Sequence, residues 1–231
     1  MPAGRVEAVL LDMGGVLVPD LPPYERAARN PILCRELREA GIEEPELLVT
    51  EGSQRLIDAY RALASEATQP DLDAVLSELT PRLRGLLLDA YRSETAGLPP
   101  PHVRDVVEQL ARSYRLGLVS NTIIPGDHHA RALEDAGILR YLGAALWSAN
   151  FGRRKPDPAM LLQVLEELEV AAEHAVLVGD KIRTDVLAAS RAGMRAIWLR
   201  SPADAPHTGE AEPDFIIHDL RELPDLLQEI G

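Results

Sequence analysis

The chain has 231 residues, of which 46% are hydrophobic and 26% are charged, a balance that excludes wholesale disorder. The formal net charge of −13 repels polyanions, which argues against a nucleic-acid partner. No apolar run reaches the roughly 18 residues that a membrane-spanning helix needs, and the N-terminal apolar run is interrupted by Glu7. We therefore expect a cytoplasmic protein without a membrane partner. Its one cysteine, Cys34, excludes a disulfide within the chain.

The first predicted element is a buried strand over residues 6–11, because this short apolar run stops at Asp12 and the glycines Gly14 and Gly15. Residues 21–94 contain no convincing strand. Apolar residues recur there at helical spacing, and two groups share a face: Leu56, Tyr60 and Leu63, and Leu72, Val75, Leu76, Leu79, Leu83, Leu86 and Leu87. This stretch is therefore predicted to be helical.

Short apolar runs and amphipathic helices alternate along the rest of the chain. Strands are predicted at residues 116–120, 144–148, 175–179, 195–199 and 214–217, and the last helix at residues 220–230. Two of the intervening helical faces consist of Val103, Val106, Val107, Leu110 and Tyr114, and of Met160, Leu161, Val164, Leu165 and Leu168. The alternation predicts an α/β fold with a doubly wound, Rossmann-like parallel sheet.

Proline and glycine mark both borders of the helical stretch, at Pro22 and Pro23 and again at residues 97–101. We predict that residues 1–20 and 96–231 form one α/β core domain. Residues 21–95 are predicted to form an all-helical cap domain, inserted after the first strand.

Polar residues follow several of the predicted strands, where ligands of an open parallel sheet bind. They are Asp12 after the first strand, Ser120, Asn121 and Thr122 after the second, Lys155 before a later helix, and Asp180 with Asp185 after a further strand. Singly, each has an ordinary explanation, because such an aspartate can cap a turn or helix and a lysine can be solvated. Their order and chemistry together predict one site.

Four motifs that contain these residues resemble those of the haloacid dehalogenase-like hydrolases, in family order. They are Leu11-Asp12-Met13-Gly14-Gly15-Val16-Leu17, then Val119-Ser120-Asn121-Thr122, then Arg154-Lys155-Pro156-Asp157-Pro158, and last Val178-Gly179-Asp180 through Asp185, with Ala192-Gly193-Met194 behind it. The helical stretch between the first two motifs resembles the small cap that one branch of the family carries at this place.

The resemblance implies a phosphatase in which Asp12 attacks phosphorus and forms an aspartyl-phosphate. It implies a Mg²⁺ ion between Asp12, the main-chain carbonyl of Gly14 and Asp180, supported by Asp185. It also implies that Ser120, the backbone of Asn121 and Lys155 bind the phosphoryl group, with Lys155 balancing the negative charge that builds up during transfer. The implied partner is a small phosphorylated substrate, and the oligomeric state stays open.

The local charge favours an anionic substrate without any reference to the family. Basic residues cluster at two presumed loops of this acidic protein: Arg153, Arg154 and Lys155, and Lys181 and Arg183. They predict a cationic mouth. The alternative is that the arginines point to solvent or pair with Asp157 and Asp185.

The sequence departs from the family's phosphatases at Gly14, where they usually carry a second aspartate that acts as general acid and base. The loss of such a group typically costs about 10²–10⁴-fold in rate. Asp20, His128 and His129 are the nearest replacements, although Asp20 suits a turn and the histidines suit the start of a solvated helix. Two other functions stay open: a phosphate-binding regulatory protein without turnover, and a 2-haloacid dehalogenase, which in this family needs no metal.

Overall fold

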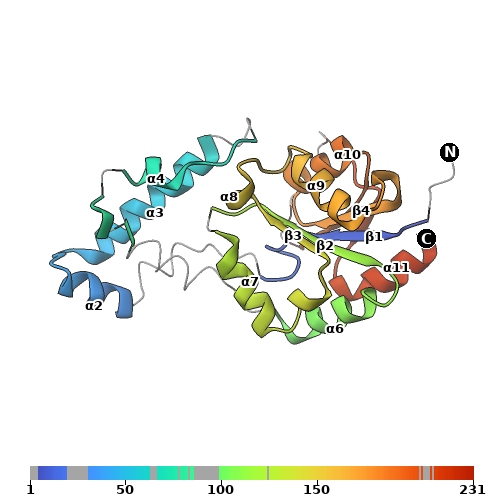
Figure 1. Cartoon of the computed structure of the whole chain (residues 1–231), viewed down its shortest axis with the longest axis horizontal. Helices are drawn as coiled ribbons and strands as arrows, with labels where there is room; N and C mark the ends of the chain where they lie inside the picture. Colours follow the sequence, from blue (N-terminus) through green and yellow to red (C-terminus); the bar gives the residue numbers. More distant parts are fainter. Residues whose placement is uncertain are drawn as a thin grey trace.

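A computed structural model shows an α/β core with a group of helices standing beside it (Figure 1). It describes residues 5–19, 31–62, 67–77, 79–82, 84–85, 99–123, 125–202, 204, 209 and 211–231. No helix among these residues is long and apolar enough to cross a membrane.

Six strands form one sheet in the order β3-β2-β1-β4-β5-β6, and every neighbouring pair is parallel. The strands are β1 (Ala8–Leu11), β2 (Arg115–Ser120), β3 (Ala144–Trp147), β4 (Ala175–Gly179), β5 (Arg195–Leu199) and β6 (Phe215–Ile217). All six predicted strands are present. The first begins two residues later than predicted, at Ala8.

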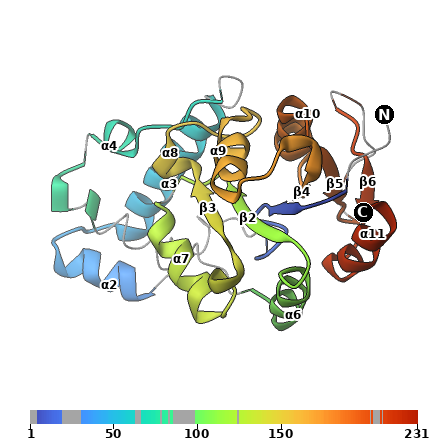
Figure 2. The ribbon, with the colours of Figure 1, turned by 45° about the vertical axis from the view of Figure 1, so that its right-hand side comes forward.

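Helices cover both faces of the sheet (Figure 2). One face packs against α6 (Pro101–Leu110), α7 (Gly126–Asp135) and α11 (Leu223–Ile230), and the other against α9 (Ala159–Leu168) and α10 (Leu187–Ala192). The shorter elements of the core are η1 (Leu139–Tyr141), α8 (Ser148–Phe151), η2 (Ala172–His174), η3 (Ile182–Val186) and η4 (Leu220–Glu222). The doubly wound core that the alternation predicts is therefore confirmed.

The central strand β1 explains why its sequence is apolar without interruption. Val9 and Leu11 join the hydrophobic cluster on the α6 side, whereas Ala8 and Leu10 join the cluster on the α9 side. All four residues are completely buried. A strand covered on both faces needs no polar alternation, so the run of apolar residues follows from its place in the sheet.

The register of β1 fixes where the candidate site lies. Leu11 is paired with Leu118 of β2 on one side and with Val178 of β4 on the other. The carboxyl ends of these three strands therefore lie at the same edge of the sheet. The chain also winds away from β1 in both directions, which makes this edge the topological switch point where ligands bind in open α/β sheets.

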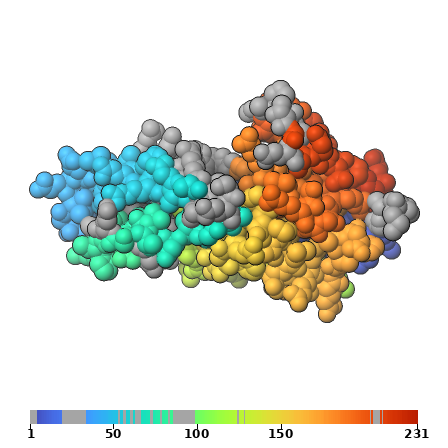
Figure 3. All heavy atoms as spheres, turned by 90° about the horizontal axis from the view of Figure 1, so that it is seen from above, coloured from blue at the N-terminus to red at the C-terminus, as the bar shows by residue number. Residues whose placement is uncertain are grey.

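The inserted segment contains α2 (Pro31–Glu39), α3 (Pro45–Ala62) and α4 (Leu72–Val75). Figure 3 shows this segment, coloured blue to green, as a lobe beside the yellow-to-red core. The helical face predicted over residues 72–87 is divided, because α4 ends at Val75 and a new helical turn begins at Pro81, a residue suited to the first position of a helix. Both predicted domain borders lie outside the described residues, so the division at residues 20 and 96 stays a prediction.

Gly117 in β2 brings α9 close to the sheet. A Cβ atom at this position would lie 2.5 Å from Cγ1 of Val164 and 3.2 Å from Cδ1 of Leu168. Because the packed core cannot absorb this overlap, we predict that Gly117→Ala lowers the free energy of unfolding by about 1–3 kcal/mol.

Urea unfolding monitored by circular dichroism measures this change. Gly85→Ala is the matched control, because no atom of the described residues lies within 4 Å of the Cβ position of Gly85. Equal midpoints for the two variants would contradict the packing argument.

Candidate active site

Asp12 lies directly after β1 and is held there by backbone hydrogen bonds. Its N–H donates to the Val178 carbonyl at 2.9 Å, and its Oδ1 accepts the N–H of Met13 at 2.7 Å. The chain then turns sharply, because the N–H groups of Leu17 and Val18 both donate to the Met13 carbonyl at 2.9 Å. The side chain of Asp12 is only slightly exposed. The turn therefore fixes one carboxylate at the edge of the sheet.

Gly15 has a positive φ of 76° in this turn. A Cβ atom on Gly15 would lie 2.3 Å from Oδ2 of Asp180, so the position needs glycine for both its backbone angle and its closeness to the aspartate. Gly14 is not among the glycines with positive φ. The conformational demand on this pair of glycines therefore falls on Gly15.

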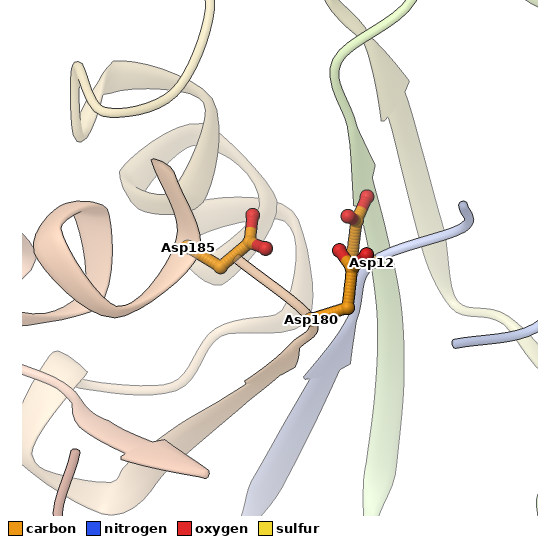
Figure 4. Close-up of side chains that lie close together, drawn as sticks. All are labelled: Asp12, Asp180 and Asp185. Atoms are coloured by element: carbon orange, nitrogen blue, oxygen red, sulfur yellow. The ribbon is translucent and has the colours of Figure 1, made fainter. Parts of the chain in front are cut away.

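Three carboxylates meet at the edge of the sheet: Asp12 after β1, Asp180 after β4 and Asp185 in η3 (Figure 4). One oxygen from each lies within 4.8 Å of the other two. Gly179 lets Asp185 approach, since a Cβ atom on Gly179 would lie 2.2 Å from the Cβ of Asp185. Asp185 also accepts the N–H of Lys181 at 2.9 Å. An oxygen-only cluster of this kind suits a hard divalent cation.

Lys155 supplies the positive charge at this cluster, and its side chain is fully buried. Its Nζ lies 2.9 Å from Oδ1 of Asp12 and 2.8 Å from Oδ1 of Asp185. It also donates to the Val119 carbonyl at 2.8 Å. These three oxygens match the three N–H groups of an ammonium ion. Lys155 therefore links the end of β2 to two of the three carboxylates.

The pKa values of the lysine and of the first aspartate follow from this burial. Desolvation lowers the pKa of Lys155, but the charges of Asp12 and Asp185 outweigh it and hold that pKa above its ordinary value. The pKa of Asp12 is raised to about 6, because desolvation and, to a smaller extent, the charge of Asp185 outweigh the attraction of Lys155. Lys155 is therefore charged at neutral pH, and Asp12 loses its proton only near pH 6.

The loop after β2 is tied to the loop that carries Lys155. Ser120 is buried at the end of β2. The side chain of Asn121 donates to the Lys155 carbonyl at 2.8 Å and accepts the Lys155 N–H at 2.8 Å. This reciprocal pair fixes the lysine relative to Ser120. The sequence did not reveal this role of the Asn121 side chain, because only the folded chain brings residues 34 positions apart into contact.

Two further residues hold this loop and were not predicted to do so. Ser148 Oγ accepts the N–H of Thr122 and donates to its carbonyl, both at 2.9 Å. His129 Nε2 lies 3.0 Å from Oγ1 of Thr122. Ser148 had a signal in the sequence, since it is the polar last residue of the strand predicted over residues 144–148. The solvated position expected for His129 is wrong, because its side chain is buried against the loop.

The predicted cationic mouth is only partly present. Arg153 is exposed but forms an ion pair with Asp157, and Arg154 is buried, so only Arg154 adds no exposed charge to the mouth. Lys181 is half exposed, and its Nζ lies 3.4 Å from Oδ2 of Asp180. The two lysines of the chain are thus both beside the carboxylates. Asp20 and the side chain of His128 lie outside the described residues.

Comparison with known proteins identifies the family. A family model for haloacid dehalogenase-like hydrolases matches residues 6–193. The chain belongs to the haloacid dehalogenase-like hydrolases. The resemblance inferred from the four motifs is therefore confirmed.

Relatives of this hydrolase include phosphatases. A phosphoglycolate phosphatase of Pseudomonas fluorescens is 30% identical over 218 residues, which cover 93% of this chain and 77% of that protein. The crystal structure of a phosphatase of this family from Thermococcus onnurineus is 25% identical with a TM-score of 0.69, covering 96% of this chain and 98% of that one. A 2-haloacid dehalogenase from Pseudomonas syringae is also 25% identical, with a TM-score of 0.67 and coverage of 98% and 100%. The chain is a hydrolase of the phosphatase type.

The buried lysine gives a prediction about stability. Lys155→Met leaves Asp12 and Asp185 buried without their cation, and breaking such a pair costs about 3–5 kcal/mol of unfolding free energy. The loss should shrink as the pH falls from about 8 to 5, because protonated carboxyls no longer repel each other.

Lys181→Met is the matched control, since that lysine forms a half-exposed ion pair worth about 0–1 kcal/mol. Chemical denaturation of metal-free protein across this pH range gives both values. A Lys155→Met variant as stable as Lys181→Met at pH 8 would show that the carboxylates do not depend on Lys155.

Proposed function

We propose that this protein is a Mg²⁺-dependent phosphatase that hydrolyses a small organic phosphate monoester through an aspartyl-phosphate on Asp12. One observation carries the proposal: the Asp12 carboxylate is paired with a fully buried lysine and lies beside two further carboxylates. An anionic nucleophile can approach a phosphate only where positive charge offsets their repulsion. A buried lysine and a cation at the carboxylates together provide that charge.

The residues present fit a magnesium ion. Asp12, Asp180 and Asp185 provide carboxylate oxygens, and the two glycines beside them leave room for Asp180 and Asp185 to reach the cluster. Among the described residues, the carbonyls of Met13 and Val18 accept the backbone hydrogen bonds of this turn, and the Gly14 carbonyl accepts none. We assign Asp12, the Gly14 carbonyl and Asp180 as ligands, supported by Asp185. When bound, the ion would neutralise phosphoryl charge.

Each of the site residues then has a defined task in the transfer of the phosphoryl group. An oxygen of Asp12 attacks phosphorus as the bond to the leaving group breaks, which splits one difficult displacement into two easier steps. Lys155 balances the charge of Asp12 and of the transferring group, and its three contacts hold it in place. Ser120 and the backbone N–H of Asn121 bind phosphoryl oxygens. Water then cleaves the aspartyl-phosphate and regenerates Asp12.

Gly14 offers no side chain that could protonate the leaving group. An aryl or acyl phosphate departs readily as an anion, whereas an alkyl phosphate does not. We therefore predict a steep dependence of kcat/KM on the pKa of the leaving group, with aryl and acyl phosphates far ahead of alkyl esters. A series of phosphate esters of graded leaving-group pKa, assayed by phosphate release, measures this dependence. A flat series with rapid alkyl ester turnover would show that another residue supplies the proton, and Asp20, His128 and His129 would be mutated first.

Restoring the carboxylate gives the complementary prediction. Gly14→Asp should raise the turnover of alkyl phosphates by up to about 10²–10⁴-fold, the range that a general acid contributes. It should change the turnover of aryl phosphates much less. The substitution requires no positive φ of an aspartate, because the positive φ of this turn lies at Gly15. Gly15→Asp is the control, and it should not raise the turnover of alkyl phosphates, because its Cβ atom would collide with Asp180.

The raised pKa of Asp12 predicts how magnesium binding depends on pH. Below about pH 6 the metal must displace a proton from Asp12, so the apparent affinity should fall by up to about tenfold per pH unit. Above that pH the carboxylate is ionised and the affinity should level off. Isothermal titration with Mg²⁺ from pH 5 to 8 measures the profile. Asp12→Asn should bind more weakly and lose the pH dependence, and an unchanged profile in that variant would assign the proton elsewhere.

Two alternatives are separated by simple assays. Chloride release from a short 2-chloroacid without metal would favour a dehalogenase. The similar structure from Pseudomonas syringae is that of a 2-haloacid dehalogenase, so this alternative is tested. The acidic cluster argues against it, because dehalogenation at carbon needs no metal. If the protein turns over neither substrate but phosphate raises its melting temperature, a non-catalytic phosphate-binding protein is favoured.

A further inference from the structure

The inserted segment is docked on the core in the middle of its length. Residues 67–69 run antiparallel to residues 152–154, with a β-bridge between Thr68 and Arg153. The Arg154 N–H donates to the Ala67 carbonyl at 2.9 Å, and the Gln69 N–H donates to the Gly152 carbonyl at 3.2 Å. In the sequence, this contact is distant from both predicted borders of the insert, which lie at residues 20–21 and 95–96.

The side chain of Gln69 reaches a second loop of the core. Its Nε2 donates to the Thr122 carbonyl at 3.0 Å, and Ser148 Oγ donates to the same carbonyl at 2.9 Å. Its Oε1 is buried and has no hydrogen-bond partner within the described part of the chain. A buried oxygen without a hydrogen bond lowers the stability of the fold, so selection for stability alone would not favour glutamine at position 69.

Both loops that Gln69 contacts carry residues of the site. Thr122 comes two residues after Ser120, and Arg154 comes directly before Lys155. The two loops are joined to each other by the paired hydrogen bonds of Asn121 and the Lys155 backbone. Gln69 and its backbone therefore brace one connected unit from the side of the insert.

We propose that Gln69 is a positioning residue, through which docking of the inserted segment fixes the geometry of Ser120, Asn121 and Lys155. The inference rests on the proposed phosphatase function, because it assigns these three residues to the phosphoryl group. Gln69 acts through the two loops and does not touch the reacting atoms. Turnover of any substrate, whatever its leaving group, then depends on this contact.

Gln69→Met is the decisive variant, because methionine keeps the size of the side chain and removes both the hydrogen bond and the unpaired oxygen. Stability should therefore stay close to that of the wild type. We expect kcat to fall about tenfold, since small misplacements of positioning groups cost up to about 10²-fold. The fall should be equal for acetyl phosphate and for a bulky aryl phosphate. Gln54→Met is the matched control, because Gln54 lies exposed in the same insert and bonds only to Asp58 among the described residues.

Two kinetic results would overturn the proposal: an unchanged kcat for both substrates, or a fall confined to the bulky ester, which would make Gln69 a contact for the leaving group. Hydrogen exchange of the Thr122 and Lys155 amides tests the same idea without turnover, because both N–H groups are bonded within the braced loops. Faster exchange at both amides in Gln69→Met supports it, and unchanged exchange overturns it. An inactive wild type with faster exchange in the variant would refute the phosphatase function and leave the bracing intact.

Discussion

The repulsion between three carboxylates at one edge of the sheet is the constraint on which the site depends. Asp12, Asp180 and Asp185 lie close enough to destabilise one another, and burial makes that repulsion stronger. Lys155 relieves it by placing one ammonium group between two of them and against a backbone carbonyl. The arrangement keeps the Asp12 carboxylate out of bulk water. In the proposed mechanism, a cation bound at the three carboxylates would offset the remaining repulsion.

The parallel sheet is what makes such crowding possible. Because β1 is paired with β2 and β4 in register, the residues after all three strands leave the sheet together. Glycines then allow the close approach, since Gly15 and Gly179 each occupy a position where a Cβ atom would collide with an aspartate. The hydrophobic layers on both faces hold this edge rigidly, so the carboxylates cannot separate to reduce their repulsion.

The insert and the missing acid concern different steps of the same reaction. Gly14 offers no side chain that could act on the leaving group, whereas the docked residues 67–69 contact the loops that we propose to hold the phosphoryl group. Under the proposed mechanism, the protein keeps the residues that bind and attack phosphorus, and the substrate or another group supplies the proton. This mechanism therefore favours esters whose leaving group departs without protonation.

The sequence by itself determined the fold class, the strand positions and the candidate residues, because hydrophobic periodicity and strand-end residues are local properties that the chain carries without its partners. Only the tertiary structure decided what each polar residue contacts. It buried Arg154 and His129, paired Asn121 with the Lys155 backbone, and brought Gln69 to the loop after β2. These contacts join residues far apart in the chain, and no local pattern specifies a partner that packing alone brings within hydrogen-bond distance.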